Sequence, residues 1–99
     1  MARYDVYLFS GETNFVLDVQ ADLLDDLNTR IVVPLFELSK APKPAKRLNP
    51  TFEFKGISYV LATQFLAAVP CSELKQPVTN FSNYSDDITN ALDMVFQGF

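Results

Sequence analysis

The 99-residue sequence predicts one domain that is mainly β-sheet and has an α-helix at its C-terminal end. Apolar and polar residues alternate near the N-terminus, which is typical of strands with one buried face. A Lys-Gly pair between two apolar segments in the middle of the chain indicates a β-hairpin with a two-residue turn. Apolar residues at helical spacing close the sequence. A chain of this length buries about 60–70% of its unfolded surface on folding, so a second chain would help to stabilise it.

The first two strands are expected at 3–9 and 15–20, joined by turn-forming residues at 10–14. Their expected buried faces consist of Tyr4, Val6 and Leu8 in the first strand and Phe15, Leu17 and Val19 in the second. The polar residues Asp18 and Gln20 fall on the opposite side. The two segments therefore predict an N-terminal hairpin.

The segment 21–30 is an acidic loop that carries several leucines. It is followed by a β-branched run at 31–38 that is long enough for a buried strand. Pro34 interrupts this run and lacks a ladder donor, so a sheet edge or a bend is expected there. The next segment, 39–50, holds three of the six prolines and four of the eight positive charges, which indicates a solvent-exposed connection.

The segment 51–63 predicts the clearest hairpin, because Gly56 after Lys55 supplies the positive φ of a tight turn. Its shared apolar face would consist of Phe52, Phe54, Ile57, Tyr59 and Leu61. A further short strand is expected up to Pro70, and the segment 72–84 is expected to be a connection with weak or mixed structure.

The final helix is expected to begin with Ser85 as N-cap, followed by two carboxylates that favour the positive end of the helix dipole. Its apolar stripe consists of Ile88, Ala91, Leu92, Val95 and Phe96. Gly98 lies where helices commonly end in a left-handed residue. An aromatic residue, Phe99, is therefore presented directly after a rigid element.

Composition limits the chemistry of the chain. There is no histidine and one cysteine, Cys71, so an internal disulfide, a Cys/His nucleophilic pair and the usual zinc ligand sets are excluded. Cys71 is expected to be a small buried residue. The net charge of −4 argues against a dedicated binder of phosphate backbones and favours a protein partner. No segment resembles a membrane span or a secretory signal, so a cytoplasmic protein is expected.

Two charged groups are candidates for chemistry. Asp22, Asp25 and Asp26 could act as acid or base or hold a hard cation, but a solvated loop is the favoured interpretation. The cations of the Pro/Lys connection could contact nucleic acid, but no stacking aromatics accompany them, so solvated charge is again favoured. These cations are Lys40, Lys43, Lys46 and Arg47. No metal, cofactor or catalytic residue is predicted.

Two long segments resemble the CcdB toxins, which are the poison halves of toxin–antitoxin pairs that act on DNA gyrase. They are "FVLDVQADLLDDLNTRIVVPL" at 15–35 and "DDITNALDMVFQGF" at 86–99. The order of the pieces also fits, with "LDVQAD", "RIVVPL" and the pair Val69 and Pro70 in sequence. The resemblance covers nearly the whole chain, and the two segments agree in spacing and residue type.

The resemblance implies a homodimer built on a small, bent antiparallel sheet of SH3-like barrel type, a fold shared with the MazF and Kid ribonuclease toxins. CcdB proteins are not enzymes. In the family, the ends of the two C-terminal helices of the dimer enter the cavity between the A subunits of gyrase and trap the complex that holds cleaved DNA. A CcdA antitoxin neutralises the toxin, and the pair represses its own operon, so operator DNA is bound only together with antitoxin. No membrane partner is implied.

The positions that match the gyrase-binding residues of the family are Gln97, Gly98 and Phe99, flanked by Phe96, Asp93, Leu23 and Leu24. The best-known family member has a tryptophan where this chain has Gln97. Phe99 stands in place of an aliphatic residue and would supply the aromatic contact instead.

Three alternatives stay open. An mRNA endoribonuclease of MazF/Kid type would need an arginine beside an acid or base, and Arg30 with Thr29 or Asp18 is the best set in this chain. A non-toxic homologue would keep only antitoxin binding. In the third alternative, residues 97–99 only cap the helix and pack Phe99 on the sheet of the same chain.

Overall fold

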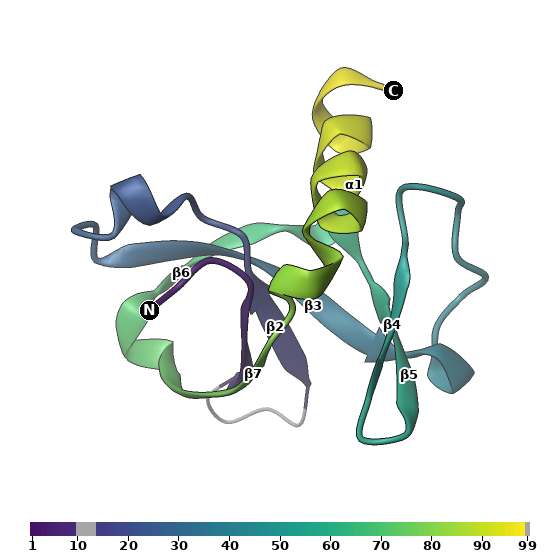
Figure 1. Ribbon diagram of the computed structural model, residues 1–99, viewed down its shortest axis with the longest axis horizontal. Helices are drawn as coiled ribbons and strands as arrows, with labels where there is room; N and C mark the ends of the chain where they lie inside the picture. Colours follow the sequence, from purple (N-terminus) through teal and green to yellow (C-terminus); the bar gives the residue numbers. More distant parts are fainter. Residues whose placement is uncertain (10–13, 99) are drawn as a thin grey trace.

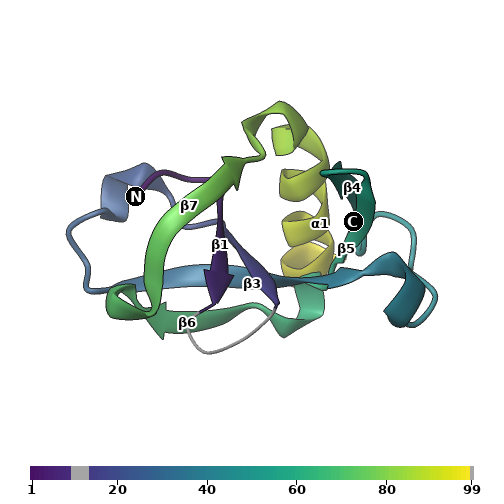
Figure 2. The same ribbon diagram turned by 90° about the horizontal axis from the view of Figure 1, so that it is seen from below.

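The computed structural model describes residues 1–9 and 14–98, and within them an antiparallel sheet curls around one helix. The expectation of a mainly β fold with a bent antiparallel sheet and a C-terminal helix is confirmed. In Figure 2 the sheet runs from β7 on one side of α1 to the β4–β5 hairpin on the other, so α1 lies inside the curl. The turn expected at 10–14 falls mostly outside the described residues.

The strands follow the order β4-β5-β3-β2-β1-β7 across the sheet, and β6 pairs with β3 beside this path. The elements are β1 (Asp5–Phe9), β2 (Phe15–Asp18), β3 (Thr29–Glu37), β4 (Thr51–Phe54), β5 (Ile57–Leu61), β6 (Ala67–Pro70), β7 (Leu74–Asn80) and α1 (Ser85–Gln97). Short 3-10 turns lie at Asp22–Leu24, Leu38–Lys40, Thr63–Phe65, Cys71–Glu73 and Ser82–Tyr84.

The main core lies between α1 and the concave face of the sheet. Ile88 and Ala91 of α1 are fully buried there, because the apolar stripe of the helix faces the strands. Their buried partners from the strands include Val6, Leu17, Val33, Leu35, Tyr59 and Leu61. An aromatic group adds a second attachment, since the ring of Phe52 lies 4.7 Å from that of Tyr84 at the start of α1. The helix is therefore held at its N-terminal half.

A second apolar cluster corrects the expectation of one buried face in β1. Tyr7 is 1% exposed, whereas Leu8, expected to be buried, is 46% exposed. β6 and β7 follow each other in the chain and pair with opposite sides of the β3-β2-β1 group, so the sheet also curls around its other face. Tyr7 packs there with other buried residues, namely Val16, Val32 and Leu74.

The segment 72–84 is not a weakly structured connection, because it contains β7, which pairs with β1. Its residues are mostly exposed and include Pro77, and its register with β1 shifts twice. An irregular edge strand of this kind lacks the apolar alternation by which strands are predicted. β7 is therefore not predictable from alternation in the sequence.

Pro34 does not mark a sheet edge, since β3 is paired along both sides. On one side Pro34 lies opposite Val16 of β2. On the other side β6 pairs with the first half of β3 and β5 with the second half, and the carbonyl of Pro34 accepts the N–H of Ala62 between them. Pro34, which has no N–H to donate, therefore lies in β3 between the part paired with β6 and the part paired with β5.

The local expectations for the hairpin and the helix end are confirmed. β4 and β5 pair through a tight turn in which Lys55 has φ 53° and Gly56 has φ 78°. Gly98 is left-handed, with φ 80°, at the end of α1. Ser85 is not the N-cap: the helix begins at Ser85, and Tyr84 precedes it without a side-chain capping bond, because the 3-10 turn at Ser82–Tyr84 leads directly into α1.

Candidate functional site

The C-terminal half of α1 extends past the sheet and presents an exposed aromatic side chain. Phe96 is 69% exposed although the sequence pattern places it on the apolar stripe. The stripe is buried at Ile88 and Ala91, but two turns later the helix has moved beyond the strands (Figure 1). Phe96 is therefore free to contact a partner.

The residues next to Phe96 are also accessible. Gln97 and Gly98 are exposed, and Asp93, one turn earlier, is half-buried. The N–H of Gly98 donates to the carbonyl of Met94 at 3.1 Å, which closes the helix with a left-handed residue. Phe99 lies outside the described residues. The matched positions at 93 and 96–98 thus form one small surface at the tip of the helix.

The acidic loop, residues 21–28, carries the other two matched positions. Leu23 is 94% exposed and Leu24 is 47% exposed, both on the 3-10 turn Asp22–Leu24. Leu27 is 51% exposed on the same loop, and neither the sequence pattern nor the resemblance singled it out. Three leucines held in solvent are unusual for a loop and mark a candidate contact surface.

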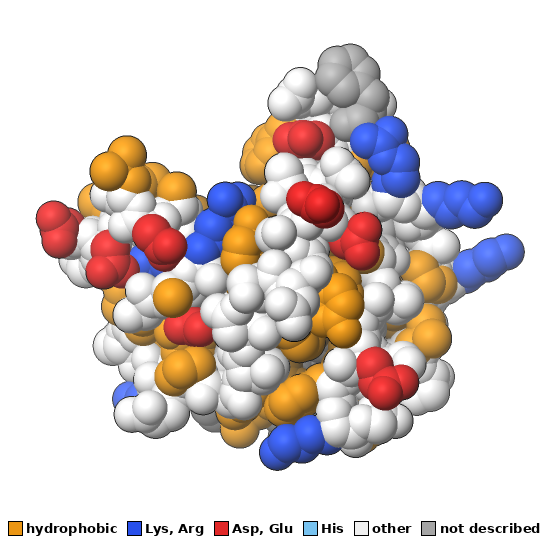
Figure 3. Space-filling model, viewed as in Figure 1, with side chains coloured by type: hydrophobic (Ala, Val, Ile, Leu, Met, Phe, Trp, Pro, Cys, Tyr) orange, Lys and Arg blue, Asp and Glu red, His pale blue; other side chains and the backbone are white. Residues whose placement is uncertain are grey.

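The loop and the helix tip do not form one continuous patch. In Figure 1 the blue turn of the loop and the yellow end of α1 project from the same side of the sheet, and they stand apart. Figure 3 shows a hollowed surface between these two projections. A partner that bound both would have to span this hollow.

A buried arginine joins the loop to the sheet. Arg30 of β3 is fully buried, and its Nε donates to Oδ2 of Asp18 at 2.8 Å. Its Nη1 donates to Oδ1 of Asp25 in the loop at 2.9 Å. Its Nη2 lies 2.7 Å from the same Asp18 oxygen as an ionic contact outside hydrogen-bond geometry. One guanidinium therefore fixes Asp18 of β2 and Asp25 together.

Gln20 makes a second link between the loop and the sheet. Its side-chain oxygen accepts the N–H of Ile31 at 3.1 Å, and its side-chain nitrogen donates to the carbonyl of Leu24 at 3.0 Å. Sequence alternation placed Asp18 and Gln20 on the polar side of the strand, but both are buried. Two polar residues within an otherwise apolar segment were the available signal of this network.

Burial affects the acidity of two groups in this region. The pKa of Asp18 is raised chiefly by burial, which outweighs the opposing hydrogen bonds from Arg30 and the Gln20 N–H. Burial, with smaller contributions from the carboxylates of Asp5 and Asp18, raises the pKa of Tyr7 to about 12. Tyr7 is therefore a neutral phenol at physiological pH.

The residues considered for ribonuclease chemistry do not form an accessible site. Arg30 and Asp18 are 0% exposed and bonded to each other, so neither can touch a substrate in this structure, and Thr29 is half-buried. Asp25 is paired with Arg30, and Asp22 accepts the N–H of Arg3 at 2.8 Å. Within residues 1–9 and 14–98, no cluster of three or more potential metal ligands is found.

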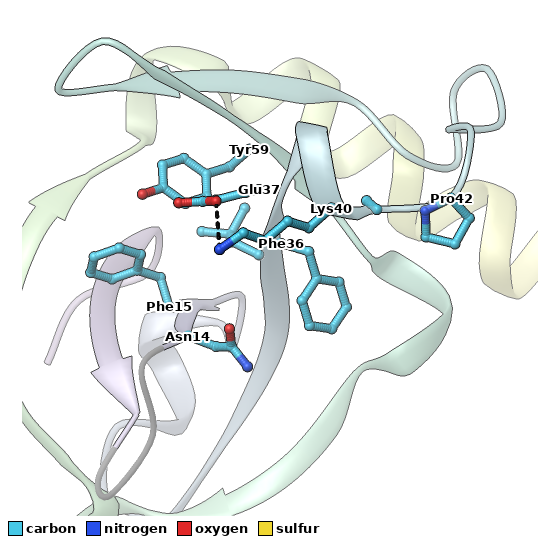
Figure 4. A pocket seen from close by; sticks show the side chains of 9 residues that line it. Asn14, Phe15, Phe36, Glu37, Lys40, Pro42 and Tyr59 are labelled. Atoms are coloured by element: carbon cyan, nitrogen blue, oxygen red, sulfur yellow. Dashed lines mark ion pairs between the residues drawn. The ribbon is translucent and has the colours of Figure 1, made fainter.

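A surface pocket of about 390 Å³ lies next to the Pro/Lys connection (Figure 4). Its aromatic lining residues are Phe15, Phe36 and Tyr59, and an ion pair of 3.2 Å joins Lys40 to Glu37 among them. Lys40 is 78% exposed, as expected for solvated charge. The amine of Lys40 is held by Glu37 in an exposed ion pair, which fits a solvated surface charge.

Cys71 is half-buried, whereas a buried residue was expected. It directly follows β6, and its Sγ lies 3.6 Å from the carbonyl oxygen of Leu27 in the acidic loop. In the part of the chain that the structure describes, no helix is long and apolar enough to cross a membrane.

A comparison with protein families gives a match over nearly the whole chain. The family model described as CcdB protein matches residues 3–98. This range includes both anchored ends of the acidic loop and α1 up to Gly98. The chain therefore belongs to the CcdB family, whose members are toxins of toxin–antitoxin pairs.

Proposed function

We propose that this protein is a toxin that binds the A subunit of DNA gyrase and traps the complex with cleaved DNA. The observation that carries the proposal is Phe96, 69% exposed at the tip of a helix whose other end is anchored in the core. In this proposal the contact surface consists of the matched positions Asp93, Phe96, Gln97, Gly98 and Phe99, together with Leu23 and Leu24 of the loop.

The physical argument rests on preorganisation. A large apolar side chain on a rigid element loses little conformational freedom on binding, so most of the burial energy contributes to affinity. α1 is rigid at this point because Ile88 and Ala91 fix it to the sheet and Gly98 closes its last turn. Leu23, at 94% exposed, offers a second apolar contact.

The protein is further proposed to act as a homodimer that a CcdA-like antitoxin neutralises, with operator DNA bound only together with that antitoxin. An apolar hollow of about 290 Å³ on the face opposite α1 supports an additional protein contact. Val16, Val32, Phe36 and Val69 line it, and Phe65 at its edge is 60% exposed. Covering such a surface is favourable for a chain of this size.

A second candidate function is favoured by Gln97. An amide at this position cannot stack on a partner arginine as an indole can. A homologue that has lost gyrase poisoning and keeps antitoxin binding would show this substitution. The ribonuclease alternative is disfavoured, since Arg30 and Asp18 are occupied with each other in the interior.

The experiment is an equilibrium titration of the purified protein against isolated gyrase A and gyrase B subunits. A truncated chain without residues 97–99 and the variant Ile57→Ala, which alters an exposed apolar residue at the β4–β5 turn, serve as comparison and control. The proposal expects binding to gyrase A alone, loss of binding on truncation and no effect of Ile57→Ala. If the wild-type protein binds neither gyrase subunit but does bind a CcdA-like antitoxin in a separate titration, the result would instead identify the non-toxic homologue.

A further inference from the structure

The loop 21–28 is bonded to the rest of the protein at its start, middle and end, while its leucines face solvent. At its start, Asp22 accepts the N–H of Arg3 at 2.8 Å. In its middle, the Leu24 carbonyl accepts from Gln20 and Asp25 pairs with Arg30. At its end, the N–H of Cys71 donates to the carbonyl of Asn28 at 2.9 Å.

Arg30 is the deepest of these attachments. Its side chain is 0% exposed, whereas Asp25, which it holds, is 55% exposed at the surface. Asp18 supplies the countercharge in the interior, so the cation stays in place without Asp25. Arg30 thus connects its buried ion pair with Asp18 to the exposed carboxylate of Asp25, the residue after Leu24.

We propose that Arg30 is a positioning residue: by binding Asp18 and Asp25 at once, it fixes the loop 21–28 so that Leu23 and Leu24 meet the gyrase A subunit already ordered. Leu27, 51% exposed on the same loop, belongs to this ordered apolar surface as an additional contact residue. This inference rests on the proposed binding of gyrase A. It assigns the buried polar network a role in affinity, in addition to stability.

The physical reason is the cost of ordering a loop. A free loop whose backbone becomes fixed on binding loses conformational freedom, and this loss weakens affinity. In the folded protein the loop backbone is already ordered, because the side-chain links and three backbone hydrogen bonds within the loop hold the turn. The backbone bonds join the N–H groups of Leu24, Asp25 and Leu27 to the carbonyls of Ala21, Asp22 and Leu24.

The test uses Asp25→Ala, with Asp26→Ala as its matched control on the neighbouring carboxylate. Both variants remove one negative charge from the exposed loop, but only Asp25 is bonded to Arg30. Hydrogen exchange at the amides of Leu24 and Leu27 reports loop opening in the free protein. The affinity for gyrase A reports the consequence for binding, and Asp25→Asn, which keeps an oxygen acceptor for Nη1, tests rescue.

In Asp25→Ala we expect exchange at both amides to accelerate about tenfold and gyrase A to bind about tenfold more weakly, the change that 1.4 kcal/mol of lost ordering produces. Asp26→Ala should leave both quantities unchanged, and Asp25→Asn should recover most of the loss. Leu23→Ala should weaken gyrase A binding less in the Asp25→Ala background than in the wild type. This coupling is expected although the ion pair of Asp25 does not involve Leu23.

Unchanged exchange in Asp25→Ala would overturn the positioning role, and so would faster exchange with unchanged affinity. Equal losses of affinity in Asp25→Ala and Asp26→Ala would show a plain charge effect and overturn it as well. If the wild-type chain fails to bind gyrase A, it is the proposed function that fails. The exchange rates then still decide whether Arg30 orders the loop.

Discussion

Replacing Phe96 by alanine should separate binding from folding at the tip of α1. Phe96 is 69% exposed, so its truncation should change the free energy of unfolding by less than about 0.5 kcal/mol. The same exposure leaves surface for a partner to cover. An aromatic residue carries about 200 Å² of surface, so at 69% exposed some 140 Å² is available, worth about 3.5 kcal/mol at about 25 cal/mol per Å².

Alanine keeps the backbone and Cβ part of this area, and the partner covers the ring incompletely, so the expected loss of binding free energy is about 2 kcal/mol. This corresponds to a roughly thirtyfold weaker affinity for gyrase A, measured by titration calorimetry. Urea unfolding checks the fold, and Ile57→Ala, 43% exposed at the β4–β5 turn, is the control. An affinity within about twofold of the wild type, with unfolding unchanged, would refute the reasoning that Phe96 is an anchor.

Three further outcomes are expected. Gln97→Trp adds an exposed indole beside Phe96 and should tighten gyrase A binding by about 1 kcal/mol in the same titration. An unchanged affinity would show that position 97 does not contact gyrase A. Ile88→Ala truncates a 0% exposed side chain in the core and should lower the free energy of unfolding, measured in urea, by about 2–4 kcal/mol. A loss below about 1 kcal/mol would argue against the packing of α1 on the sheet. The pKa of Tyr7 is raised from 10.0 to about 12 in the folded protein, so the phenol of the unfolded chain ionises first as pH rises. The contribution of Tyr7 to the free energy of unfolding is therefore complete below pH 10 and is lost as pH rises toward 12. Wild type should therefore lose about 1 kcal/mol more stability than Tyr7→Phe between about pH 9 and about pH 11, and parallel losses would contradict the buried phenol.

Local patterns predicted the parts of the fold that local chemistry determines. The Lys55–Gly56 turn, the C-terminal helix and the left-handed Gly98 were predictable, because each depends on a few neighbouring residues, although the helix begins one residue earlier than its expected N-cap allowed. β7 was missed because an edge strand with exposed residues and Pro77 is stabilised by its partner β1, which sequence alternation does not show. Its pairing depends on the tertiary arrangement of the sheet, in which β1 leaves one side open to β7.

The same distinction applies to the candidate site. The positions at the helix tip and in the loop came from a resemblance, and the structure then showed Phe96 and Leu23 exposed. The network behind the loop was not predictable. Arg30 and Asp18 are twelve residues apart, and their contact depends on the pairing of β2 with β3. Asp18 also lies on the side of its strand that alternation assigns to solvent.

The most direct test of gyrase poisoning is to incubate the purified protein with gyrase, supercoiled plasmid and ATP, and to score linear DNA after detergent and protease treatment. The chain without residues 97–99, shown by urea unfolding to be folded, is run beside it. Linear DNA that accumulates with the full chain and is absent with the truncated chain is the predicted result. Equal amounts of linear DNA with both chains, or none with a folded wild-type protein, would contradict gyrase poisoning through the tip of α1.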